Sequence, residues 1–502
     1  MKVLTAQGSN LTHVERQHHR IGDLVHAVVH FASEESAQLL YFGWIPKTGG
    51  WSRLLAVIGR PKHALIEWHH AAPTFGQTAY PSLSARWPAA LWLEREMWEL
   101  TKVLPVGHPD LRAILHPENQ EERIVVHGDE VFQLPLGPVR SDVVESMFMR
   151  FDTQGEQIVH MQPELFYKHR DIERLAVGLL YPDGRFLAER VAGTSTIAHA
   201  TAYARAIEHA LGHVVHPKVE QERIVFGELE RLYNHAHDMA QMASAAGMTV
   251  AQAQLSRVKE ECLRVNGDLC GSRYLRNAVL PYKGSDVEWA QVVSTVIRRL
   301  RDINGRFTQC LDLLRRTPTF VDRFVGAGIV KQEWARAYGT VGPVARACGQ
   351  PVDVREDYLR DRYEQQAYRV VVDEAGTGDG WARFVVRAGE WEISQRVLTK
   401  GLQLLANGDF MEAGSLAGTQ DDSKNDGFSL ERTGIGLSES PRGRVCHVVQ
   451  LDPDGRLAFW GIRAASAWNW PVLGLAVANG NIQQDFPPIE ASFGLSCAGV
   501  DR

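Results

Sequence analysis

Long stretches of helical periodicity run through the middle of the chain. Apolar residues recur every three to four positions in five segments, residues 164–178, 195–212, 219–246, 250–265 and 286–316. This spacing places apolar side chains on one face of an α-helix. The second part of the chain is therefore predicted to be a helical bundle that carries small β elements.

Short apolar runs outside these segments predict strands. In the first part of the chain they are LVHAVVHFA, AQLLYFGWI, SRLLAVIG and HALIEWHHA, and further on VFQLPLGPVR and SMFMRFDTQGEQIVHMQP. The last of these should turn at Gln154–Gly155, and GRVCHVVQLDPDGRLAFWGIRAAS predicts a hairpin that turns at Asp454–Gly455. ARWPAALWLEREMWELTKVL predicts a helix with Pro88 near its start.

These elements predict an α+β protein of two domains. Residues 1–118 form a small N-terminal α/β sandwich domain, residues 119–130 are a polar linker, and residues 131–502 form the mainly helical domain. A chain of 502 residues is long enough to bury a core in each domain.

Composition excludes several classes of protein. A net charge of −6 argues against a nucleic-acid partner. No apolar run approaches the roughly 20 residues of a membrane span, and the first residues lack the apolar core of a signal peptide. The six cysteines form no C-x-x-C pair, so a cluster held by four thiolates is not expected in this chain. No P-loop or G-x-G-x-x-G motif follows a predicted strand.

Several segments, taken in order, resemble known families. PSLSARWPAALWLEREMWEL followed by GHPDLR resembles the small 30 kDa-type subunit of respiratory complex I. The second domain resembles its hydrogenase-like 49 kDa-type partner, through LPLGPVRSDVVES, ELFYKHRDIERLA, AERVAGTSTIAHATAYARAIE, ERIVFGELERLYNHAHDMA, NGDLCGSRYLRN, GPVARACGQPVDVR, ARFVVRAGEWEIS and SPRGRVCHVV. A fused chain of this kind is typical of the large subunits of membrane-bound, energy-converting NiFe hydrogenases.

The resemblance also identifies what is missing. In such hydrogenases four cysteines hold the metal centre, two in R-x-C-G-x-C-x-x-x-H and two in D-P-C-x-x-C. Here those positions are Ala192, Ser195, Ser496 and Gly499, and Cys497 is one residue out of register. A nickel–iron centre needs these soft thiolates, so none is expected here. The mature chain is expected to end at Arg502.

Complex I implies a second kind of site, a quinone pocket. Its loop G-P-x-H-P-x-x-H supplies a histidine, and a tyrosine follows the arginine of the next motif. In this chain Arg140 and Val144 stand at the two histidines and Gly193 stands at the tyrosine. The resemblance therefore leaves quinone binding by other groups open and predicts no cofactor held by this chain itself.

Polar residues persist around these positions. Glu145 and His199 match residues beside the hydrogenase centre, and with Arg140 they form the candidate catalytic set. Arg190, Arg346, Asp353 and Arg355 are expected in a structural polar lattice, and Asp142, His169, Arg170 and Glu173 complete the charged set. Two interpretations stay open for Glu145 and His199: a cavity that handles protons near neutral pH or couples conformational changes, or a retained lattice of ion pairs.

Two other groups of residues invite interpretation. His235, His237 and Asp238 could suggest a metal, but residues two apart on a helix face different directions, which favours packing. The segment from His108 to Arg112 is predicted to be an interdomain contact, with Glu94, Arg95 and Glu96 as docking charges.

The resemblance implies a role in a membrane assembly. The chain would lie peripherally on the cytoplasmic face of the inner membrane and couple electron transfer in a neighbour to ion translocation. Its partners would be a small subunit of the complex I 20 kDa type that holds a 4Fe–4S cluster, a ferredoxin-like iron–sulfur subunit and antiporter-like membrane subunits. The alternative is a non-redox scaffold of a related ion-translocating complex. Helices 195–212 and 286–316 carry apolar residues on more than one face, which predicts that partners cover them.

Overall fold

The computed structural model describes residues 14–502 apart from 33, 35, 48–49, 62–64, 73–77, 116–123, 125, 141–144, 409 and 411–431, so half of the predicted linker lies outside the described residues. The strands are β1 (Val14–Arg20), β2 (Gln38–Lys47), β3 (Gly50–Arg60), β4 (Leu65–Ala72), β5 (Ala79–Pro81), β6 (Leu104–Val106), β7 (Val131–Leu136), β8 (Phe148–Gln154), β9 (Gln157–Glu164), β10 (Thr433–Ser440), β11 (Gly443–Leu451) and β12 (Leu457–Arg463).

The helices are α1 (Ile21–Phe31), α2 (Leu91–Thr101), α3 (Ile172–Ala176), α4 (Tyr181–Ala188), α5 (Thr196–Leu211), α6 (Pro217–Ala245), α7 (Thr249–Cys270), α8 (Trp289–Arg315), α9 (Pro318–Asp322), α10 (Gln332–Ala337), α11 (Gly342–Ala347), α12 (Val354–Asp357), α13 (Arg360–Tyr363), α14 (Gly380–Asn407), α15 (Ala465–Val477), α16 (Phe486–Phe493) and α17 (Ala498–Asp501). The predicted α+β class is confirmed. Among the described residues, no helix is long and apolar enough to span a membrane.

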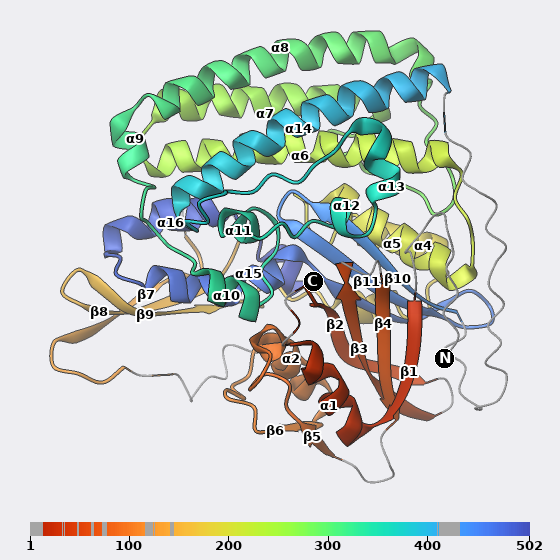
Figure 1. Cartoon of the computed structure of the whole chain (residues 1–502), viewed down its shortest axis with the longest axis vertical. Coiled ribbons are helices and arrows are strands. Elements are labelled where there is room, and N and C mark those ends of the chain that lie inside the picture. Colours follow the sequence, from red (N-terminus) through yellow and green to blue (C-terminus); the bar gives the residue numbers. More distant parts are fainter. Residues whose placement is uncertain are drawn as a thin grey trace.

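The N-terminal part is a four-stranded sheet with the order β1-β4-β3-β2, in which β1 runs parallel to β4 and the other pairs are antiparallel (Figure 1). Three of the four predicted strands are confirmed. The remaining prediction, a strand at LVHAVVHFA, is wrong, because this segment belongs to helix α1. Leu24, Val25 and Val28 are buried at a helical spacing, which such a short apolar run does not distinguish from a strand.

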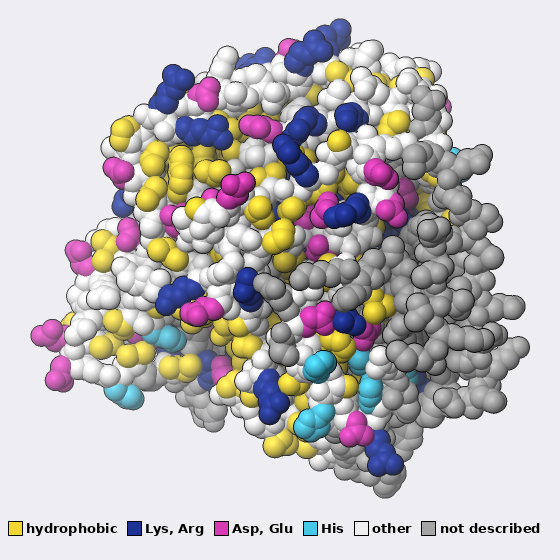
Figure 2. Space-filling model, in the orientation of Figure 1, with side chains coloured by type: hydrophobic (Ala, Val, Ile, Leu, Met, Phe, Trp, Pro, Cys, Tyr) yellow, Lys and Arg dark blue, Asp and Glu magenta, His cyan; other side chains and the backbone are white. Residues whose placement is uncertain are grey.

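Four long helices form the bundle. α6 packs against α7 and α14, and α8 packs against the same two helices (Figure 1). α8 buries an apolar stripe that includes Val293, Leu300 and Phe307, and Figure 2 shows Lys and Arg side chains along the outer edge where α8 lies. The sequence did not predict α14. Its buried residues include Arg383, Arg387 and Glu390 among the apolar ones, which weakens the apolar periodicity.

α5 lies directly against β10 and β11. The contact is so close that a Cβ atom at Gly436 would lie 1.9 Å from the backbone oxygen of Ala202. Nearly the whole helix is buried by this chain itself. The prediction that α5 leaves an apolar face for partners is therefore wrong: β10, β11 and the bundle cover that face.

The N-terminal sheet packs against the sheet β10-β11-β12. Leu40 and Tyr41 of β2 share one apolar cluster with Ile435 of β10 and Val448 of β11. The predicted turns are confirmed, with Gly155 between β8 and β9 and Gly455 between β11 and β12, both at positive φ. The segments before α5 and after α16 meet, since a Cβ atom at Gly499 would lie 3.6 Å from Cβ of Ala192, and the candidate site lies there.

Candidate functional site

The four positions that the hydrogenase motif assigns to cysteine are buried and meet in one place. A Cβ atom at Gly499 would lie 3.6 Å from Cβ of Ala192 and 3.8 Å from Oγ of Ser496. The amide of Ser195 donates to the backbone oxygen of Ala192 over 3.0 Å, which holds the fourth position beside them. The fold thus brings the four motif positions close together, although none of the four side chains is a thiol.

These side chains do not fit a nickel–iron centre. Alanine and glycine offer no side-chain donor, and the serine hydroxyls are hard neutral donors rather than soft thiolates. Cys497 lies beside Ser496, but its Sγ packs 3.7 Å from Sδ of Met147 in an apolar cluster. Burial and the nearby Glu145 raise the pKa of this thiol, so it stays protonated, unlike a metal ligand.

Glu145 holds the C-terminal segment in place. Its Oε1 accepts hydrogen bonds from Oγ of Ser496 at 3.0 Å and from the amide of Ala498 at 3.3 Å, and its Oε2 accepts from the amide of Cys497. A carboxylate with three such donors is well anchored. Glu145 therefore contacts Ser496, one of the four motif positions, directly.

Arg170 joins the two halves of the centre. Its guanidinium donates to the backbone oxygens of Arg190 and Val191 at 2.8 and 2.7 Å, and to that of Ala498 at 2.9 Å. The side chain of Arg190 itself is 45% exposed and donates to the oxygen of Phe186 within its own segment. Arg170, rather than Arg190, therefore links the segment of Ala192 to the segment of Ser496 with its side chain.

Arg140 forms a bidentate pair with Glu490 of α16, with N–O distances of 3.0 and 2.8 Å. Glu490 was not singled out from the sequence. Asp142 and Val144 lie outside the described residues. Gly193, at the position of the complex I tyrosine, is exposed, and a Cβ atom there would meet nothing within 4 Å.

His199 belongs to a buried chain of three aromatic side chains. Nε1 of Trp460 donates to Nδ1 of His447 over 3.1 Å, and Nε2 of His447 lies 2.9 Å from Nδ1 of His199. The indole N–H can only donate, so Nδ1 of His447 accepts and its proton is on Nε2. That proton is donated to Nδ1 of His199, which leaves the proton of His199 on Nε2.

Both histidines stay neutral at neutral pH. Burial, with a smaller contribution from Arg170, lowers the pKa of His199 to about 3, and burial lowers the pKa of His447 well below its usual range. The expectation that His199 exchanges a proton near neutral pH is therefore wrong. Glu145 and His199 also contact different partners, so in this structure they do not form a hydrogen-bonded pair.

His447→Phe is expected to leave Nδ1 of His199 without its donor and to cost about 1–3 kcal/mol of unfolding free energy. Nitrogen NMR of labelled histidines should show that His199 carries its proton on Nε2 in the wild type and shifts toward the other tautomer in the variant. His447→Gln supplies an amide donor and serves as the control. An unchanged His199 spectrum in His447→Phe would contradict the assigned hydrogen-bond chain.

Arg346, Asp353 and Arg355 lie in one buried network of ion pairs. Arg346 contacts Asp353 at 2.8 Å, Glu439 at 3.0 Å and Glu390 at 2.7 Å. Arg355 contacts Asp353 at 2.8 Å and Glu228 at 2.9 Å. Burial alone would lower the pKa of Arg346, but its carboxylate neighbours raise it. The network joins α6, α11, α12, α14 and β10.

His235 and His237 point to different neighbours, as their spacing predicts. Nε2 of His235 lies 2.8 Å from Glu390 of α14, whereas His237 lies 3.3 Å from Nζ of Lys259 on α7. Asp238 pairs with Arg387 and Arg442. Within the described part of the chain, no group of three or more His, Cys, Asp or Glu side chains is arranged around a common metal position.

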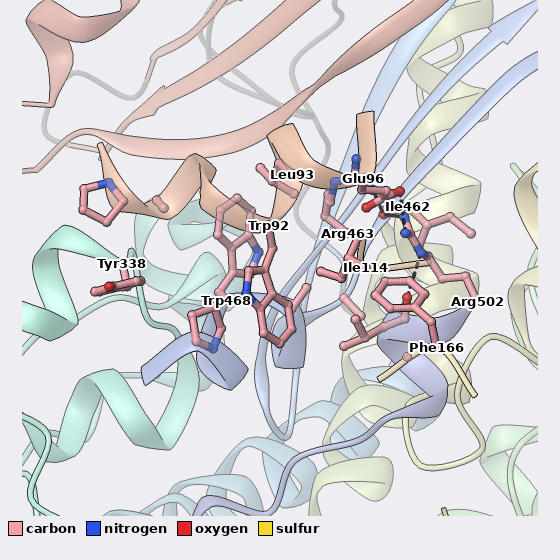
Figure 3. A pocket seen from close by; sticks show the side chains of 17 residues that line it. Trp92, Leu93, Glu96, Ile114, Phe166, Tyr338, Ile462, Arg463, Trp468 and Arg502 are labelled. Atoms are coloured by element: carbon pink, nitrogen blue, oxygen red, sulfur yellow. Dashed lines mark hydrogen bonds and ion pairs between the residues drawn. The ribbon is translucent and has the colours of Figure 1, made fainter. Parts of the chain in front are cut away.

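The contact between the two domains extends to the site that contains Gly499. Figure 3 shows Glu96 of α2 beside Arg463 and Arg502 at one end of a mainly apolar pocket, which Gly499 also lines. Glu96 accepts from Nη2 of Arg502 at 2.6 Å, so the predicted docking charge is confirmed there. Arg112 also links the two domains, donating to Gln162 at 2.8 Å.

Glu94 does not dock between the domains. It is fully buried and accepts hydrogen bonds from Ser82, Leu83 and Ser84, all within the N-terminal part. The prediction for Glu94 is therefore wrong. Residues two positions apart on a helix face different directions, so Glu94 and Glu96 of α2 have different partners.

The comparisons with known proteins match this architecture. Residues 246–502 match the family "Respiratory-chain NADH dehydrogenase, 49 Kd subunit", and residues 55–127 match the corresponding "30 Kd subunit" family. The chain belongs to the 49 Kd subunit family, as the motifs predicted, with a segment of the 30 Kd type ahead of it.

The relatives include both hydrogenase and complex I proteins. The chain is 28% identical to formate hydrogenlyase subunit 5 of Escherichia coli, covering 84% of this chain and 77% of the relative. It is 26% identical to the carbon monoxide-induced hydrogenase of Rhodospirillum rubrum, covering 73% and 98%. It is 25% identical to the C/D 2 subunit of the NADH-quinone oxidoreductase of Aquifex aeolicus, covering 65% and 64%.

Sequence reasoning missed several residues of the site. These are His447, Trp460, Glu490, Glu390 and Glu439. His447 lies inside the matched segment SPRGRVCHVV and Glu390 inside ARFVVRAGEWEIS, so the motifs themselves carried a signal for both. Glu490 and Trp460 lie outside every matched segment, and only the contacts reveal them.

Proposed function

We propose that this chain is the core subunit of a membrane-bound, complex I-like or hydrogenase-like oxidoreductase assembly, and that it works without a nickel–iron centre of its own. Electrons would reach a 4Fe–4S cluster in a small neighbouring subunit. This subunit would pass the resulting change of charge or conformation to membrane subunits that translocate ions.

The observation that carries the proposal is the absence of thiol side chains at the four motif positions. The fold brings Ala192, Ser195, Ser496 and Gly499 together but offers no thiolate for nickel. Glu145 still binds the segment that carries Ser496, and Arg170 binds both this segment and the one that carries Ala192. A change on one side would therefore reach the other through hydrogen bonds rather than through a metal.

Within this proposal Glu145 is the group that moves a proton, because a carboxyl in contact with Ser496 can exchange one at the centre. His199 acts as a neutral, fixed hydrogen-bond donor through Nε2. Arg140 positions α16 through Glu490. Quinone is a candidate electron acceptor, bound by groups other than those of complex I.

Exposed apolar side chains support the expected partners. Leu175, Val177 and Phe186 on the segment of α3 and α4 are 58%, 52% and 40% exposed. Phe132 of β7 and Val139, which follows β7, are 67% and 84% exposed. Apolar residues gathered in this way are typical of protein interfaces. We assign the first segment to the small iron–sulfur subunit and place the complex on the cytoplasmic face of the inner membrane, with ferredoxin-like and antiporter-like subunits as further partners.

The test is the composition of the native complex, purified through an affinity tag on this chain. We expect iron and acid-labile sulfide from the partner subunits, and nickel far below one atom per complex. Near-stoichiometric nickel would contradict the proposal. A complex that contains no iron–sulfur subunit would instead support the scaffold function.

A further inference from the structure

A second candidate site is a small polar cavity lined by residues of α5, α6, α13 and β10. Glu230 and Arg223 of α6, Thr201 and Arg205 of α5, and Glu439 of β10 line it. Thr201 is 3% exposed, and its hydroxyl has no hydrogen-bond partner in the protein. Nε of Arg205 and Nε of Arg223 are likewise unpartnered.

Glu230 is the unusual member of this group. It is 1% exposed, and its two oxygens accept only the backbone amides of Ile197 and Ala198, at 2.6 and 3.1 Å. Among the described residues, no Lys, Arg or His nitrogen lies within ion-pair distance of it. The other buried glutamates of α6, Glu220, Glu222 and Glu228, each have a cationic partner.

A buried carboxylate without a cation is costly, whereas the protonated acid is not. Burial raises the pKa of Glu230 to about 8, although the amides of Ile197 and Ala198 and the charges of Arg231 and Arg442 oppose the shift. The unpartnered polar atoms supply the two to four hydrogen-bonding groups that a buried water needs.

We propose that the cavity holds ordered water and that Glu230 is a proton-binding site that exchanges its proton through this water. On release, the O–H bond of the acid breaks and the proton passes to the water, while the electron pair stays on the carboxylate. Arg205, whose side chain is 10% exposed and is paired with Glu220 at 2.7 Å, also lines the cavity.

The site would control the helix that carries His199. Ile197 and Ala198 are in the first turn of α5, between Ser195 and His199, and their amides, which have no carbonyl partner within the helix, donate to Glu230 instead. A carboxylate there also interacts favourably with the helix dipole. Loss of the proton therefore strengthens the cap on α5, and its uptake weakens it.

Infrared titration of the full-length protein tests the proton site. In the wild type, the carbonyl band of a buried protonated carboxyl should be present near neutral pH and disappear with an apparent pKa of about 8. Glu230→Gln should remove this band, whereas Glu392→Gln, at an exposed carboxyl of α14, should not. A band that is absent near neutral pH, or that survives in Glu230→Gln, would overturn the assignment.

Thr201→Val tests the water, because it keeps the side-chain shape and removes the hydroxyl. Loss of solvating water should raise the apparent pKa of Glu230 further. An unchanged apparent pKa of Glu230 in this variant would show that Glu230 does not exchange its proton through the cavity water. Neither measurement involves electron transfer, so this inference can fail while the proposed function holds, and the reverse is also true.

Stability provides a second readout. A carboxyl whose pKa is raised on folding contributes stability that is fully present below its unfolded pKa of about 4.3 and is lost as the pH rises through about 8. The melting temperature of the wild type should therefore fall relative to that of Glu230→Gln across this range. A constant difference between the two proteins would contradict the proton site.

Discussion

Arg346→Met is expected to lower the unfolding free energy by about 3–5 kcal/mol, enough to prevent folding at 37 °C in a marginally stable protein. The substitution removes the shared partner of Asp353, Glu390 and Glu439, which are all buried. Carboxylates left unpaired in the interior must either ionise at high cost or take up protons.

Denaturant unfolding of the purified chain or complex measures this effect. Arg190→Met is the matched control, because this arginine is 45% exposed and its nearest carboxylate oxygen, on Glu189, is 3.6 Å away. An exposed pair of this kind contributes about 1 kcal/mol or less. Equal losses in the two variants would show that the buried network does not hold the helices together.

Glu145→Gln is expected to cut the electron-transfer-coupled activity of the assembled complex by about 10²-fold or more, if Glu145 performs general acid–base work. The amide keeps the size of the side chain and removes the proton. Because the carboxylate also anchors Ser496, Cys497 and Ala498, the variant must be shown to assemble before its activity is interpreted.

Ser496→Ala separates the two roles of Glu145. It removes one hydrogen bond to the carboxylate but leaves the acid, so it should keep most of the activity. If Ser496→Ala and Glu145→Gln lose activity equally and with the same pH profile, Glu145 is an anchor only. If Glu145→Gln and His199→Phe both assemble and turn over at full rate at every pH, the centre has no chemical role and the scaffold function is favoured.

Local patterns predicted the elements whose apolar residues face one side. α8 is such a case, since its buried stripe repeats at helical spacing through Val293, Leu300 and Phe307. α14 was missed because tertiary packing buries Arg383 and Glu390 as well, and a sequence pattern does not distinguish a buried arginine from an exposed one. α1 was assigned as a strand because a short apolar run fits both periodicities.

Some residues of the candidate site could be predicted from the sequence, and others could not. Ala192, Ser195, Ser496 and Gly499 could be named from motif positions, and so could Glu145 and His199. Their partners could not, because a hydrogen bond such as that between His199 and His447 joins residues 248 positions apart. The neutral state of His199 also depends on complete burial, which no spacing of residues reveals.

The sequence by itself determined which atoms are available at the centre: without thiol side chains at the four motif positions, no arrangement of the backbone can supply soft ligands for nickel. It also determined the long amphipathic helices, because their periodicity is a local property. Only the tertiary structure decided which charges pair and which groups hold protons. Those properties depend on burial and on neighbours from distant segments, as the contrast between the paired Glu228 and the unpaired Glu230, two residues apart on α6, makes plain.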